Sequence, residues 1–120
     1  MRTFVLIAFA TLVAMVSTVP AQQQQRPQQT WLGQISDSLC ALSHEEAAYA
    51  GGGRQEKLSD RECTLACVRG GSKYVFVTDG MVYQMSDQKD PALQTFAGET
   101  VKLTGEMNGD VITAATIEKP

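Results

Sequence analysis

The sequence has few of the residues from which most functional sites are built. It contains three cysteines, one histidine and one tryptophan among 120 residues. The 10 basic residues do not outnumber the 13 acidic ones, and the formal net charge of −3 argues against a protein that tracks nucleic-acid phosphates. With 43% hydrophobic and 19% charged residues, the composition is that of a globular protein, and the length predicts one domain.

The sequence also lacks an apolar run long enough for a transmembrane helix. The longest run, Phe4–Val16, has 13 residues, whereas a span needs about 20. Arg2 precedes this run, and Val19 and Ala21 are the small residues that signal peptidase prefers at its −3 and −1 positions. We therefore expect a signal peptide over residues 1–21, secretion or a periplasmic location, and no membrane association after cleavage. An uncleaved anchor is the alternative.

The segment that follows is polar and of low complexity. Residues 22–29 read QQQQRPQQ and offer nothing to bury, so they predict a disordered leader before a domain over residues 30–120. Five segments of that domain have strand character, namely residues 31–36, 73–78, 81–86, 100–107 and 110–119. Asp79-Gly80 predicts a tight hairpin turn between the second and the third of these strands, and Asn108-Gly109 predicts one between the fourth and the fifth.

Three helices are expected between the strands. The pair Ser43 and Glu46 has capping-box spacing and predicts a helix over residues 44–50 that ends at three glycines. Ser59 and Glu62 repeat that spacing before a helix that ends at Gly70-Gly71. A third, short helix is expected from Asp90-Pro91 to Gly98.

This order of elements predicts a mainly β fold of the α+β kind. Five strands with a short helix between the third and the fourth are the plan of an OB-fold barrel, here with a helical insert between the first and the second strand. Another small α+β roll is the alternative.

Several segments resemble small secreted bacterial proteins of unknown function. They are residues 33–40 (GQISDSLC) with His44 after them, residues 62–68 (ECTLACV), and the YVFV-TDG hairpin at 74–80. The resemblance covers residues 31–117 and, more loosely, extends to periplasmic bacterial OB-fold domains. It implies export and an OB-like fold but no chemistry. In such relatives we expect a glycine directly after the first cysteine, whereas this chain has Ala41 at that position.

The three cysteines and the single histidine form the one pattern with the chemistry of a site. They are spaced as C-x3-H and C-x3-C, and residues four apart on a helix lie on the same side. Two such pairs would make a Cys3His site of Cys40, His44, Cys63 and Cys67. Zinc takes this ligand set, and copper(I) takes the thiolates.

A disulfide is the alternative use of the same cysteines. An exported chain meets oxidising conditions, and three cysteines allow one bridge with one thiol left over. The Cβ atoms of Cys63 and Cys67 would lie about 5–6 Å apart in a regular helix, whereas a bridge needs about 3.5–4.5 Å. A bridge from Cys40 to Cys63 or to Cys67 is therefore the expected pairing.

We expect a non-enzymatic binding domain whose helical insert holds a metal ion, a small ligand or a protein partner. The sequence offers no catalytic set and no phosphate-binding loop, and it does not predict nucleic-acid binding. Two other functions stay open. One is a structural envelope protein whose cysteines only form a stabilising disulfide, and the other is a thiol or redox protein that uses the spare cysteine.

Overall fold

A computed structural model of the chain describes residues 26–42 and 58–120. The predicted signal peptide, the leader up to residue 25, the helix over residues 44–50 and His44 lie outside the described residues. The elements are β1 (Gln29–Asp37), α1 (Asp60–Arg69), β2 (Tyr74–Thr78), β3 (Met81–Met85), α2 (Pro91–Thr95), β4 (Thr100–Asn108) and β5 (Val111–Glu118). Neither of these two helices is long and apolar enough to cross a membrane.

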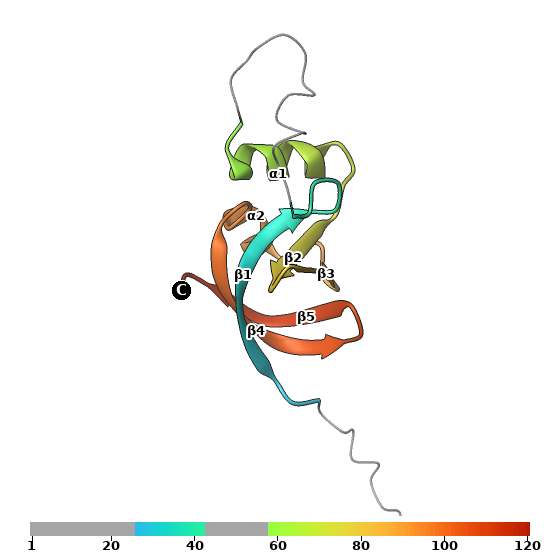
Figure 1. The fold of residues 1–120 in the computed structure, drawn as a ribbon, viewed down its shortest axis with the longest axis vertical. Helices are drawn as coiled ribbons and strands as arrows, with labels where there is room; N and C mark the ends of the chain where they lie inside the picture. The colour runs from blue at the N-terminus through green and yellow to red at the C-terminus, as the bar shows by residue number, and fades with distance from the viewer. Residues whose placement is uncertain (1–25, 43–57) are drawn as a thin grey trace, which may run out of the picture.

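The structure is mainly β, as the sequence predicts. Its five strands form one mixed sheet that closes into a ring in the order β1-β2-β3-β5-β4 (Figure 1). All neighbouring strands are antiparallel except β3 and β5, which pair in parallel. α1 lies between β1 and β2 in the chain, and α2 lies between β3 and β4, the positions expected for the insert and the short helix.

β1 starts earlier than the sequence predicts. The strand begins at Gln29, the last residue assigned to the leader, because β4 continues far enough to supply a partner: Gln29 pairs with Gly105, and Thr30 with Thr104. The two threonine hydroxyls are hydrogen-bonded at 2.9 Å. Strand pairing, rather than the local composition, sets this boundary.

One of the two predicted hairpin turns is confirmed, and the other is displaced by one residue. Asp79 and Gly80 have φ of +50° and +71°, the signs that a type I′ turn requires. Asn108, by contrast, is the last residue of β4 and pairs with Val111, so the second loop consists of Gly109 and Asp110. Of these two only Gly109 has a positive φ, at +64°, as in a type II′ turn. The prediction of Asn108-Gly109 was wrong. A type II′ turn needs a positive φ only at its first loop residue, and Gly109 supplies it there.

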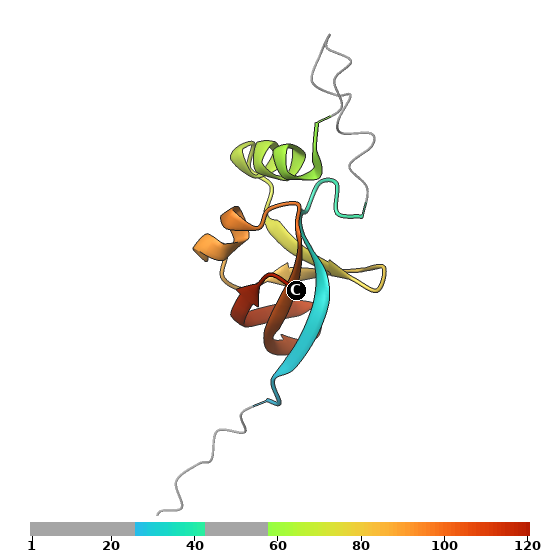
Figure 2. The same cartoon turned by 90° about the vertical axis from the view of Figure 1, so that its left-hand side faces the viewer.

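The core fills the ring with side chains from alternate strand positions. Its buried members are Ile35, Tyr74, Phe76, Met85, Leu93, Ala97, Val101, Leu103 and Ile112. Leu93 and Ala97 come from α2 and the turn after it, so α2 covers part of this core, whereas α1 lies across one end of the ring (Figure 2).

α1 is held against the end of β1 and the turn after α2. Gln34 Nε2 of β1 donates to Asp60 Oδ2 at 3.1 Å and to the Gly98 carbonyl at 2.9 Å. Arg61 donates to the Thr95 carbonyl at 2.7 Å. The turn at Gly98 approaches the backbone of α1 so closely that no side chain fits between them. These contacts determine which face of α1 lies against the turn after β1.

The capping box of α1 predicts an acid-sensitive helix end. Ser59 accepts from the Glu62 amide, and Glu62 accepts from the Ser59 amide at 2.9 Å and from its hydroxyl at 2.8 Å. These hydrogen bonds lower the pKa of Glu62 below its usual 4.5. The stabilisation is present above that usual value and is lost as the pH falls through the lower pKa of the folded state. Glu62→Gln should flatten the fall in stability between neutral pH and about pH 3 in urea unfolding. Identical profiles for both proteins would contradict this.

Candidate metal centre

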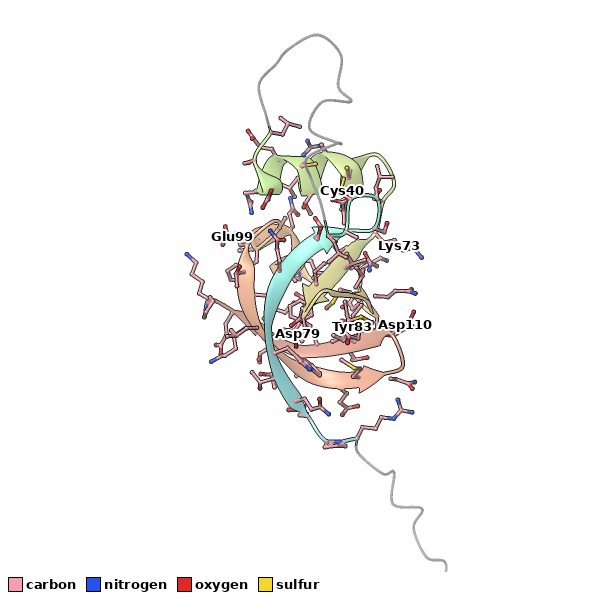
Figure 3. The ribbon with its side chains drawn as sticks, viewed as in Figure 1. Cys40, Lys73, Asp79, Tyr83, Glu99 and Asp110 are labelled. Atoms are coloured by element: carbon pink, nitrogen blue, oxygen red, sulfur yellow. The ribbon has the colours of Figure 1, made fainter. Side chains whose placement is uncertain are left out.

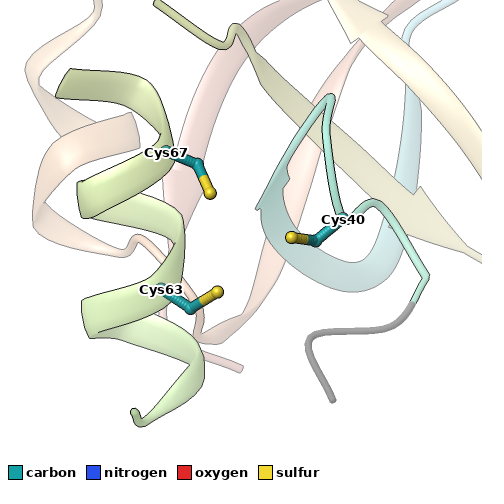
Figure 4. A group of neighbouring side chains, drawn as sticks. All are labelled: Cys40, Cys63 and Cys67. Atoms are coloured by element: carbon teal, nitrogen blue, oxygen red, sulfur yellow. The ribbon is translucent and has the colours of Figure 1, made fainter. Parts of the chain in front are cut away.

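The three cysteines of the chain come together from two elements. Cys63 and Cys67 lie one turn apart on α1, and Cys40 lies in the turn that follows β1. Figure 4 shows the three side chains converging, with Cys40 facing both helical thiols. Their Sγ atoms all lie within 4.8 Å of one another. The structure therefore unites three of the four residues that the sequence proposed for a site.

The turn that carries Cys40 is fixed by Asp37, the last residue of β1. Asp37 Oδ1 accepts from the backbone amides of Leu39 and Cys40, each at 3.0 Å, and its backbone carbonyl accepts from the Ala41 amide at 2.8 Å. Ser36 adds a hydrogen bond from its hydroxyl to the Ala41 carbonyl at 2.8 Å. Asp37 and Ser36 are both fully buried, so the turn is anchored in the interior.

Ala41 is strained in this turn. Its φ is +44°, in the left-handed region that costs an L-residue roughly 1–2 kcal/mol. Ala41→Gly removes that strain but gives the unfolded chain more freedom, so we expect a net gain of about 0.5–1 kcal/mol in the free energy of unfolding. Ala115→Gly, at an exposed site inside β5, is the control and should lower stability. Urea unfolding of both variants tests this, and a destabilised Ala41→Gly protein would contradict it.

The environment of the thiols favours their protonated form when no cation is bound. Burial, followed by the negative charge of Asp37, raises the pKa of Cys40 from 9.0 to about 11. The same two causes in the same order raise the pKa of Cys67 to about 11. Burial also raises the pKa of Cys63. These thiols therefore favour the protonated form, which is a weaker nucleophile than the thiolate.

The sulfur spacing is close to that of a thiolate metal site. Three sulfurs that bind one zinc ion at about 2.3 Å with tetrahedral angles lie about 3.8 Å apart. Separations of at most 4.8 Å come within small side-chain rotations of this value. The cluster lies at the end of the ring next to α1, where Cys40 is labelled in Figure 3. Three cysteines are thus close enough to hold a metal ion such as zinc.

The disulfide expected from the sequence is not formed. All three cysteines lie in the described part of the chain, and all three are free. The regular α1 keeps Cys63 and Cys67 at helical spacing, as the sequence argument against a bridge between them assumed. The fourth expected ligand, His44, lies outside the described residues.

Sequence reasoning missed Asp37. Its signal is present in the segment DSLC, because an aspartate two and three residues before backbone amides commonly caps a turn through its side chain. What the sequence did not reveal is the full burial of this carboxylate beside the thiols.

A separate cavity offers a place for a small organic ligand. It has a volume of about 480 Å³ and lies beside the end of β3, between Lys73 and Asp110, the two charged residues labelled on that side in Figure 3. Val75, Val82 and Met85 give it an apolar part. Both charged residues are exposed, and the Asp110 carboxylate accepts from Gln84 Nε2 at 3.2 Å. Lys73 and Asp110 therefore do not converge on one point of the cavity in the way that the three thiols converge in their cluster.

Comparison of the chain with protein-family models, curated proteins and solved structures finds no match.

Proposed function

We propose that the chain is an exported, non-enzymatic OB-like domain that binds one metal ion through Cys40, Cys63 and Cys67. The observation that carries the proposal is the convergence of three Sγ atoms within 4.8 Å from a turn and a helix that are separate in sequence. Zinc is the first candidate ion and copper(I) the second, since both accept thiolate ligands.

The order of strands supports the OB-like part of this proposal. A five-stranded ring in the order β1-β2-β3-β5-β4, with a helix between β3 and β4, has the connectivity expected of that fold. The metal ligands would then belong to the insert and to the turn that leads into it, rather than to the ring itself. Such a site connects α1 to the end of β1.

Metal content and intact mass test the proposal directly. The full chain, expressed for export and purified without chelators, should show one zinc or copper ion per molecule by native mass spectrometry and elemental analysis. The denatured mass should match cleavage after Ala21 and three reduced cysteines. Each single Cys→Ser variant should weaken zinc binding by more than about a hundredfold, because even outer-shell losses cost 10- to 100-fold. Ser86→Ala, at an exposed serine beyond β3, is the control.

His44→Ala decides the coordination number. If the affinity for zinc falls as far as in the cysteine variants, His44 is the fourth ligand. An unchanged affinity assigns the site to the three thiolates alone. Metal-free protein with a mass lower by two hydrogen atoms and a disulfide from Cys40 would contradict metal binding and favour the structural-disulfide function.

A further inference from the structure

We infer that Asp37 shifts the selectivity of the thiol cluster toward divalent and away from monovalent metal ions. The inference rests on the proposed metal site and concerns the ratio of its affinities for zinc-like dications and for copper(I). It follows from the position of one buried carboxylate and from the charge balance of the site.

Asp37 lies close to any ion that the cluster holds. Its Oδ1 accepts from the Cys40 amide at 3.0 Å. Adding the reach of a cysteine side chain, about 4 Å, and a metal–sulfur bond of about 2.3 Å places the ion within about 9 Å of the carboxylate. The charge of Asp37 also acts on all three thiols, since it contributes to raising the pKa of each.

The charge balance gives the direction of the selectivity. An ion that binds three protonated thiols releases three protons, whatever its own charge. The site therefore gains one negative charge with a dication and two with a monovalent ion. A fixed negative charge nearby therefore disfavours the site with a bound monovalent ion more than the site with a bound dication. Because both ions release the same number of protons, proton release cancels in the ratio of the two affinities.

The size of the effect follows from Coulomb's law. One unit of charge at about 9 Å in a medium of effective dielectric constant about 20 changes a binding constant about twentyfold. Removing the charge of Asp37 should therefore lower the ratio of zinc to copper(I) affinity about twentyfold. The ratio should fall even if loss of the Asp37 charge makes the thiols easier to deprotonate and so raises the affinities for both ions.

Two substitutions separate the charge of Asp37 from its hydrogen bonds. Asp37→Asn keeps an oxygen that can accept from the Leu39 and Cys40 amides but removes the charge, whereas Asp37→Glu keeps the charge and moves it. Asp79→Asn is the control for loss of a carboxylate, because Asp79 lies at the far end of β2 and asparagine tolerates its φ of +50°. Figure 3 shows Asp79 well away from Cys40.

The experiment measures zinc and copper(I) affinities of the full mature chain by competition with chromophoric chelators, under anaerobic and reducing conditions. We expect Asp37→Asn to lower the zinc-to-copper(I) ratio about twentyfold, and Asp37→Glu and Asp79→Asn to keep it within about threefold of wild type. If Asp37→Asn folds poorly by circular dichroism, the ratio is measured in the Ala41→Gly background with Ala41→Gly as reference.

The outcomes separate this inference from the proposed function. If the wild type binds both ions and Asp37→Asn keeps the wild-type ratio, the selectivity inference is overturned while the metal site stands. Equal changes of the ratio in Asp37→Asn and Asp37→Glu also overturn it, because geometry rather than charge would then be responsible. A wild type that binds neither ion refutes the metal site itself.

Discussion

Zinc is expected to raise the free energy of unfolding of the mature chain by about 4 kcal/mol when free zinc exceeds the dissociation constant a thousandfold. For a domain of this size that gain corresponds to a rise in melting temperature of roughly 15–30 °C. The reason is that the proposed ligands belong to the turn after β1 and to α1, which are held together only in the folded chain. Thermal unfolding with and without chelator measures the shift.

A ligand variant supplies the control for this shift. Cys67→Ser should lose most of this shift, because Cys67 is one of the three converging thiols. A hundredfold weaker site would stabilise the fold by only about 1.4 kcal/mol at the same free zinc concentration, and a weaker one by less. Ser86→Ala should keep the full shift. If wild-type protein with one zinc ion per chain melts at the same temperature as the chelator-treated protein, the ion does not connect α1 to the turn after β1.

Gly98→Ala is expected to destabilise the fold strongly, by about 2–5 kcal/mol. Gly98 has a φ of +74°, and a Cβ there would lie 2.3 Å from the Arg61 amide nitrogen and 2.5 Å from the Asp60 carbonyl carbon. Both are backbone atoms of α1, so no side-chain rotation can make room. The helix must move away from the ring or the turn must distort.

Gly109→Ala is the matched control for Gly98→Ala. Gly109 has a similar φ of +64°, but a Cβ there meets nothing within 4 Å, so only the backbone strain of about 1–2 kcal/mol applies. Urea unfolding of the two variants isolates the cost of the contact with α1. Gly98→Ala should also weaken zinc binding, because α1 carries two of the three proposed ligands. Equal destabilisation by the two substitutions would contradict the close approach.

Much of the local structure could be read from the sequence because local interactions create it. The Ser59–Glu62 capping box needs only residues three apart, and the Asp79-Gly80 turn needs only two residues that accept positive φ. The displaced turn at Gly109-Asp110 shows the limit. Two neighbouring dipeptides both satisfied the local rule, and the pairing of Asn108 with Val111 decided between them.

The sequence by itself determined the mainly β character, the two described helices with their N-caps, and the identity of the cysteines as the residues to examine. Each of these depends on side-chain type and spacing within a few residues. The expected end of α2 at Gly98 was wrong, because the helix stops at Thr95 with Phe96 as its C-cap. Tertiary structure alone decided that Cys40 meets Cys63 and Cys67, which are more than twenty residues away, and that Asp37 is buried beside them. The closing of the ring and the contact at Gly98 place α1 over the end of β1. No local sequence pattern encodes this placement, because it depends on contacts between residues that are far apart in the chain.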